Sequence, residues 1–165
     1  MGTTKSGRYL STKGSRRSVS DFALVHSNEG DFIKKQIRID GKPAIKLRLG
    51  NGGHGQAGMD LLDKYGIAYN ITKVWSNGVR VGNVPTHMNK KFKAKQDGQS
   101  WFPKSWTAKT IRRAGEKVAE MYKGKRIRDG VRIYGIYKGV RVGVIMTKGK
   151  IATIFPDVNQ SSLAK

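Results

Sequence analysis

The chain has 165 residues, of which 37% are hydrophobic and none is cysteine. This length fits one domain or two small lobes that share a core, and the lack of thiols excludes disulfide bonds and cysteine catalysis. Lys and Arg number 33 against 11 Asp and Glu, which gives a formal net charge of +22. Such a charge repels itself in the folded state and predicts a polyanionic partner, most often a nucleic acid. No apolar run is long enough for a membrane anchor.

The composition divides the chain into a leader and a folded remainder. Residues 1–20 are rich in Ser, Thr, Gly, Lys and Arg, and they predict a flexible basic leader without the apolar stretch of a signal peptide. Residues 21–165 are expected to fold, with an N-terminal part over 21–104 and a C-terminal part over 105–165. No internal repeat indicates a solenoid.

Hydrophobic periodicity predicts two helices and several antiparallel strands. Apolar residues recur at helical spacing over 56–65 and 107–122. Residues 32–49 alternate around Asp40-Gly41, which is typical of a hairpin turn. Further strands are expected at 67–75, 79–81, 131–137, 140–146 and 151–155. The pattern predicts an α+β fold of two small antiparallel sheets flanked by a few helices.

Two histidines lie in polar segments that contain several glycines. His54 lies within 50–56 and His87 within 82–90. Histidine exchanges protons near pH 7, but each of these two, taken alone, could equally make a structural hydrogen bond or be solvated. Together they supply the base and the acid that metal-free RNA cleavage needs, with a 2′,3′-cyclic phosphate and a 5′-hydroxyl as products. The amide of Gly53 could approach a phosphate closely.

The other candidates are weighed by their surroundings. His26 lacks glycine neighbours and is interpreted as structural. A lysine would stabilise the transition state, and Lys104, which precedes the helix over 107–122, is better placed for this than a member of the run over 90–95, because the helix N-terminus there would favour an anion. The lysine run over 90–95 is expected to follow phosphates, with Lys93 as a substrate contact. Neither cysteine nor a His-x-x-x-His pair provides a recognisable metal-ligand spacing, so no metal site is expected.

At these motifs the chain resembles the bacterial EndoU nucleases, which are related to the coronavirus and animal uridylate-specific endoribonucleases. The resemblance covers about residues 50–156. It rests on Gly52-Gly53-His54-Gly55-Gln56, on 77–84 with His87, on Gln99-Ser100-Trp101-Phe102-Pro103-Lys104-Ser105-Trp106-Thr107, and on Ile151-Ala152-Thr153-Ile154-Phe155-Pro156.

The resemblance implies an EndoU-like fold and a His-His-Lys catalytic set similar in chemistry to that of pancreatic-type ribonucleases. It implies His87 as the base and His54 as the acid. Bacterial members carry a lysine where this chain has Gln99, so Lys104 is expected to replace it, with Lys90 as second choice. By the same resemblance two further residues contact the substrate base, namely Thr107 by its hydroxyl and Phe155 by stacking.

The resemblance also implies a biological setting. Similar bacterial domains are the C-terminal parts of larger secreted toxins that act in the cytoplasm of a target cell. RNA, and tRNA in particular, would be the substrate, and an acidic immunity protein would bind the basic domain. A monomer without a cofactor is expected. The alternative is a basic RNA-binding module without catalytic activity, which would have no use for two loop histidines.

Overall fold

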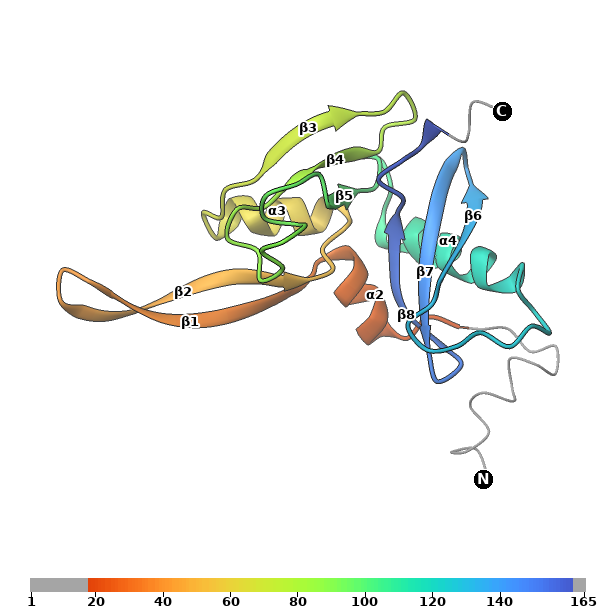
Figure 1. Cartoon of the computed structure of the whole chain (residues 1–165), viewed down its shortest axis with the longest axis horizontal. Helices are drawn as coiled ribbons and strands as arrows, with labels where there is room; N and C mark the ends of the chain where they lie inside the picture. Colours follow the sequence, from red (N-terminus) through yellow and green to blue (C-terminus); the bar gives the residue numbers. More distant parts are fainter. Residues whose placement is uncertain (1–17, 162–165) are drawn as a thin grey trace.

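The computed structural model describes residues 18–161, which form three α-helices and three small antiparallel sheets. The expected α+β class is confirmed. Two of the sheets correspond to those expected, whereas the predicted hairpin stands as a third sheet, because its two strands pair only with each other. Figure 1 shows this hairpin extending from one end of the body.

The N-terminal half surrounds helix α3 and a three-stranded sheet. The hairpin strands pair around the predicted turn at Asp40-Gly41, where both residues have positive φ. Strand β4 is the central strand of the sheet that follows, with order β3-β4-β5. The elements are β1 (Asp31–Ile39), β2 (Lys42–Asn51), α3 (Gln56–Lys64), β3 (Asn70–Val74), β4 (Arg80–Asn83) and β5 (Gln99–Trp101).

The C-terminal half is a helix packed on a three-stranded meander. Helix α4 (Ala108–Glu120) begins after Thr107, whose side chain accepts a hydrogen bond from the Thr110 amide and so caps the helix. Strand β7 (Val140–Thr147) lies between β6 (Arg132–Tyr137) and β8 (Lys150–Pro156). All three strands and the helix lie where the sequence predicts them.

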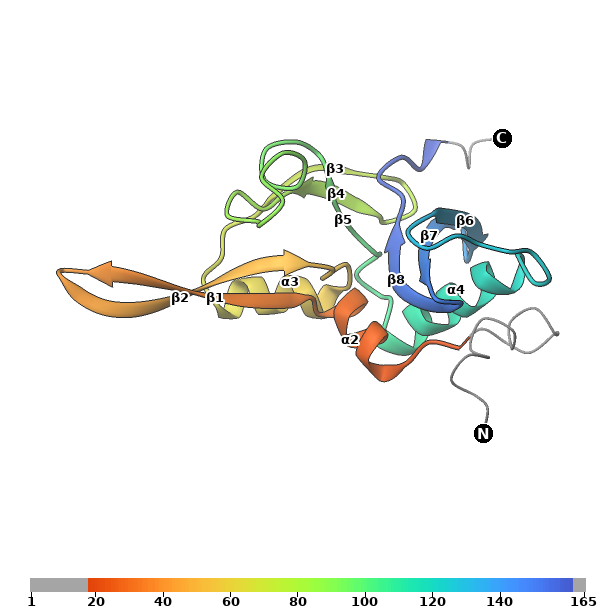
Figure 2. The ribbon, with the colours of Figure 1, turned by 60° about the horizontal axis from the view of Figure 1, so that its bottom comes forward.

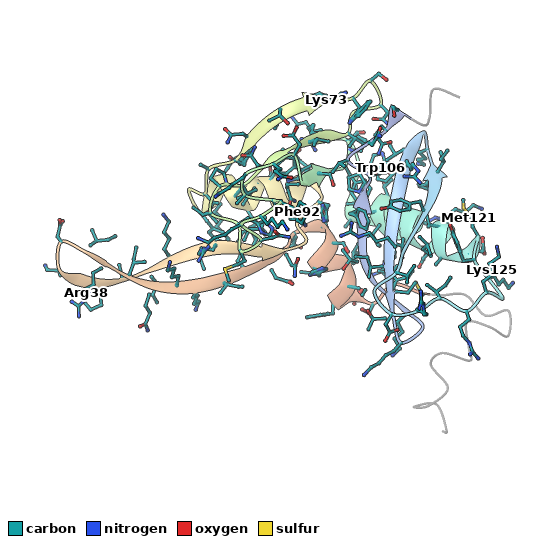
Figure 3. All side chains as sticks on the ribbon, in the orientation of Figure 1. Arg38, Lys73, Phe92, Trp106, Met121 and Lys125 are labelled. Atoms are coloured by element: carbon teal, nitrogen blue, oxygen red, sulfur yellow. The ribbon has the colours of Figure 1, made fainter. Side chains whose placement is uncertain are left out.

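The core consists of two hydrophobic clusters, of which the first joins the halves. One is centred on α4 and the meander, and it also takes Val81 from β4 and Phe102 and Trp106 from the segment after β5. Trp106 lies at the junction of the halves in Figure 3. The other cluster packs Leu62 of α3 against Leu49 of the hairpin. The end of strand β5 lies between the two clusters. Its last residue, Trp101, belongs to the second cluster, and the next residue, Phe102, belongs to the first.

Two elements were not predicted from the sequence. Helix α2 (Asp21–Asn28) has eight residues and leaves Phe22 and Val25 exposed, so no apolar stripe marks it. It contacts α4 and β8. Strand β5 has three residues and completes the sheet at the edge of β4. Both escape detection because they are short and are held by tertiary contacts.

The predicted leader largely lies outside the described residues. Of its last residues, Val19 is buried in the larger cluster, and Ser20 caps α2 by accepting from the Ala23 amide. These residues are therefore part of the fold. Within residues 18–161 no helix has the length and apolar character needed to cross a membrane.

Candidate active site

A pocket of about 530 Å³ opens where the two halves meet. Helix α2, the base of the hairpin, the loop after it, the loop before β5 and the meander all contribute to its walls. Figures 1 and 2 show α2 beside β8, with the base of the hairpin next to it. The pocket side chains that can exchange protons, carry charge, form hydrogen bonds or stack on a ligand are His26, His54, Lys93, Arg132, Tyr134, Thr153 and Phe155.

His26 is held at both ring nitrogens. Its Nδ1 lies 2.6 Å from Oδ2 of Asp31, and its Nε2 lies 3.1 Å from Oγ1 of Thr153. A carboxylate only accepts, so Nδ1 carries the proton that is donated to Asp31. These two contacts orient the ring, with Nδ1 toward Asp31 and Nε2 toward the pocket residue Thr153.

His54 is buried and has the opposite electrostatic surroundings. Its Nδ1 lies 2.7 Å from the carbonyl oxygen of Ser100, which can only accept, so Nδ1 is protonated and Nε2 is bare. Burial, followed by the positive charge of Lys93, holds the pKa of His54 well below its usual value. The ring is therefore neutral near pH 7, and Nε2 is available to accept a proton.

Backbone hydrogen bonds fix the two histidines relative to each other. The amide of Gly53 donates to the carbonyl of His26 at 3.0 Å, and that of His54 donates to Ser27 at 2.6 Å. The Ser27 hydroxyl accepts from the Ile154 amide at 2.9 Å, which ties α2 to β8 beside Thr153. Because these bonds involve buried groups, we expect the separation of the two rings to be rigid.

Gly52 is required for this arrangement. It has a φ of +68°, and a Cβ there would lie 1.9 Å from the carbonyl oxygen of His26. We predict that Gly52→Ala separates the loop from α2 and lowers cleavage activity by at least about tenfold, because small displacements of reacting groups are costly. Steady-state kinetics with Gly124→Ala as control checks this, since Gly124 also has positive φ but lies away from the pocket with free space around it. Equal activities of the two variants would contradict the prediction.

The loop before β5 contributes one positively charged side chain to the pocket, that of Lys93. It is half-buried, and burial together with the nearby Arg132 lowers its pKa to about 8. Among the lysines of the predicted phosphate-following run, Lys90, Lys91 and Lys95 are exposed and do not line the pocket. The run therefore contributes one lysine to the site.

Phe155 provides the aromatic face of the pocket. Its ring centroid lies 6.0 Å from that of His54, and the guanidinium of Arg132 lies 5.5 Å from it. Gly143 on the neighbouring strand leaves room for the ring, since a Cβ there would lie 2.4 Å from Cζ of Phe155. Thr153 and Phe155 are two residues apart on β8, so they share a face. A planar ligand group beside His54 could stack here.

His87 lies elsewhere. It is fully buried and is not among the residues that line the pocket. Its Nδ1 accepts a hydrogen bond of 2.8 Å from the Asn89 amide, which shapes the loop that carries Lys93. Burial first, then Lys93 and Arg48, lower the pKa of His87 to about 4. We therefore assign it a structural role, opposite to the catalytic role expected from the sequence.

Because the pKa of His87 is lowered in the folded protein, we expect the free energy of unfolding to depend on pH. Because the folded-state pKa is about 4 and the ordinary value is about 6.5, the unfolded chain binds the extra proton between these pH values. The contribution of His87 to the free energy of unfolding is full above pH 6.5 and falls by about 3 kcal/mol on acidification to pH 4. Urea denaturation of wild type and His87→Gln at both pH values checks this. An equal pH dependence in the two proteins would contradict it.

Other residues predicted for the site lie outside the pocket. Lys104 is exposed near the start of α4, and Thr107 caps that helix and is likewise exposed. The expectation that the Gly53 amide binds phosphate is corrected, because this amide donates to the His26 carbonyl. Of the predicted residues, the structure brings His54, Lys93 and Phe155 together and leaves His87, Lys90, Lys104, Thr107 and Gly53 out.

Sequence reasoning missed three contributors to the site. His26 was set aside because α2 was not recognised, although Asp31 five residues later is a suitable partner for an imidazole. Thr153 could have been found from its spacing of two residues from Phe155 on a strand. Nothing in the sequence near Arg132 marks it. Residues 18–161 contain no group of three His, Cys, Asp or Glu side chains that could hold a metal ion.

Comparison with known proteins gives one match. A sequence model of a bacterial EndoU nuclease family matches residues 23–158, which is most of the chain and includes both pocket histidines, Lys93 and Phe155. No curated protein matches the chain, and no solved structure matches it.

Proposed function

Because the chain belongs to the bacterial EndoU nuclease family, it is an endoribonuclease, and we propose that it cuts RNA by proton transfer through His54 and His26. The observation that carries this proposal is the pair of ring orientations. Each histidine has its Nδ1 committed to an acceptor within 2.7 Å, Asp31 for one and Ser100 for the other. Each therefore offers Nε2 to the same pocket.

His54 is the general base. Its neutral Nε2 takes the proton of the ribose 2′-hydroxyl, and the 2′-oxygen then forms a bond to phosphorus. The low pKa of His54 keeps Nε2 free of a proton in the unliganded enzyme. A bound phosphate, which offsets the charge of Lys93, would make this nitrogen more basic when substrate is present.

His26 is the general acid. The bond between phosphorus and the 5′-oxygen breaks, and this oxygen takes the proton from Nε2 of His26. Asp31 stabilises the charged ring before transfer, and Thr153 orients the Nε2–H. The products are a 2′,3′-cyclic phosphate and a 5′-hydroxyl, and the proton balance requires neither water nor a metal ion. This assignment reverses the acid role that the sequence suggests for His54.

Lys93 replaces the lysine that other bacterial members carry near the position of Gln99. In this chain Gln99 is fully buried and its side chain donates to the Gly52 carbonyl at 3.3 Å, so it supports the loop. Lys93 reaches the pocket from the preceding loop. Its ammonium group would stabilise the charge that develops on the non-bridging oxygens of the phosphate.

Phe155 binds the base of the nucleotide that supplies the 2′-hydroxyl. Stacking on an aromatic ring is sequence-tolerant and contributes about 1–3 kcal/mol per base. The Phe155 ring lies next to His54, so the ribose of a nucleotide stacked on it would lie near the general base, His54. This geometry supports cleavage of unpaired RNA, such as the loops of tRNA, because a paired base could not enter.

We further propose the biological setting that the family resemblance implies. The domain would be part of a larger secreted toxin, would act as a monomer in the cytoplasm of a target cell, and would be neutralised there by an immunity protein. The net charge of +22 supports an acidic immunity protein that associates rapidly at low salt.

The test is cleavage of total bacterial tRNA in excess EDTA. We expect discrete fragments that end in a 2′,3′-cyclic phosphate, and no cleavage when the 2′-hydroxyl at the cut site is replaced by hydrogen. Fragments with a 3′-hydroxyl, or activity only after Mg²⁺ or Mn²⁺ is added, would contradict the mechanism. Binding without cleavage under all conditions would favour the alternative of a basic RNA-binding module.

A further inference from the structure

The β1–β2 hairpin is an arm that begins at the pocket. Asp31 at the start of β1, Asn51 at the end of β2, and the adjoining Gly52 line the pocket, and Asp31 also holds His26. From there the two strands extend away from the body in both views of the ribbon (Figures 1 and 2). Nine residues of β1 span about 30 Å at ~3.3 Å per residue. An RNA chain that leaves the pocket on this side would lie beside the arm.

The hairpin carries unbalanced positive charge. Between residues 31 and 51 there are six Lys or Arg residues and only two acidic residues, Asp31 and Asp40. Within residues 18–161, none of the six forms an ion pair with a carboxylate, and Asp31 is already engaged by His26. Arg38 extends into solvent near the far end of the arm (Figure 3). The six are Lys34, Lys35, Arg38, Lys42, Lys46 and Arg48.

The strand register gathers four of these cations on one face. Lys35 lies directly opposite Lys46, and both are exposed. Arg48 lies two residues from Lys46 toward the pocket, and Lys42 lies four residues from it toward the turn, so alternation puts all on the same side. Like charges directly opposite each other destabilise a strand pair. An anion bound between them would remove this repulsion.

We propose that this face of the hairpin binds the phosphate backbone of the RNA substrate beyond the catalytic pocket. The inference rests on the proposed function, because the RNA is the one whose cleavage site occupies the pocket. Successive cations on one strand are spaced by about 6.6 Å or its multiples, which forms a row rather than a single anion site. Each neutralised phosphate releases counterions and contributes affinity without sequence preference. The arm therefore favours long substrates over short ones.

The test compares Lys35→Gln/Lys46→Gln with Lys109→Gln/Lys123→Gln. Both double variants remove two exposed positive charges, but Lys109 and Lys123 lie on or just after α4, outside the pocket lining. Substrates are a trinucleotide, which is too short to extend along the arm, and an unstructured RNA of about 20 nucleotides, which can follow it. We expect the hairpin variant to lose about tenfold in kcat/KM on the long RNA at moderate salt, and to keep wild-type kcat/KM on the trinucleotide.

Salt dependence gives a second readout that does not require cleavage. Binding of a fully 2′-O-methylated RNA, which lacks the nucleophile, should show a shallower dependence of log K on log salt in the hairpin variant, by about two units or less. Equal losses on short and long substrates, or an unchanged salt dependence, would overturn the proposal. An unchanged salt dependence is also the result expected if the arm binds a protein partner instead of RNA. If the wild type cleaves neither RNA, the proposed function fails, while the binding measurement still decides the role of the hairpin.

Discussion

Replacement of His26 or His54 by alanine is expected to lower kcat for RNA cleavage by about 10²- to 10⁴-fold, the usual contribution of a positioned acid or base. The physical reason is that each ring has its Nδ1 held by an acceptor, Asp31 for His26 and the Ser100 carbonyl for His54, so that its Nε2 is left for proton transfer in the proposed mechanism. Without either ring, water must perform a proton transfer with unfavourable pKa values. Steady-state kinetics on an unstructured RNA, with circular dichroism to verify folding, measures the effect.

His87→Ala is the matched control for this prediction. His87 is the third histidine of the chain; it is fully buried and close in sequence to Lys93, but it lies outside the pocket lining. Its removal creates a cavity and should lower stability by about 2 kcal/mol or more. Because the His87 ring also shapes the loop that carries Lys93, we expect some loss of kcat in the folded variant, but a much smaller one than in His26→Ala. A loss of kcat in folded His87→Ala as large as in His26→Ala would refute the assignment.

Lys93→Met is the second prediction with a large effect. Methionine fills similar space but carries no charge, so the developing charge on the phosphate would lose its nearest cation. We expect a fall in kcat of about 10²- to 10³-fold, as for the removal of one donor from an oxyanion site. Lys104→Met, at an exposed position outside the pocket, should keep wild-type kcat. Loss of activity in Lys104→Met instead would restore the candidate favoured by the sequence.

The pH dependence of the reaction identifies the same lysine. The pKa of Lys93 is lowered to about 8 by burial and by Arg132, and in the proposed mechanism the cationic form is the active one. Activity should therefore be retained below pH 8 and should decrease as pH rises through this value. In Lys93→Arg the group stays charged, so the alkaline decrease should move to higher pH. A pH–rate profile that is the same in both proteins would contradict this role.

The sequence predicts most of the secondary structure because the long elements carry strong periodic signals. Apolar residues recur at helical spacing in α4 and alternate with polar residues in much of the meander β6–β8, and Asp40-Gly41 marks the turn of the hairpin. The short helix α2 has no apolar stripe, and β5 is defined by its pairing with β4. Elements of this kind depend on tertiary contacts, which local pattern does not contain.

The active site shows the same division. His54, Lys93 and Phe155 were found because a glycine turn, a lysine run and a C-terminal motif are visible in the sequence. His26 was missed because its role depends on three contacts made in space: Asp31, the Thr153 hydroxyl, and the backbone of the loop before His54. His87 was chosen because its surroundings resemble a functional loop, whereas in the fold its ring is buried as a local hydrogen-bond acceptor.

The central claim, that His26 is the acid and His54 the base, is tested most directly with an RNA whose scissile 5′-oxygen is replaced by sulfur. A thiolate leaves without protonation, so this substrate needs the base but not the acid. We predict that His26→Ala cleaves it at a rate near that of the wild type, whereas His54→Ala remains slow. Rescue of His54→Ala instead, or equally slow cleavage by both variants, would contradict the account.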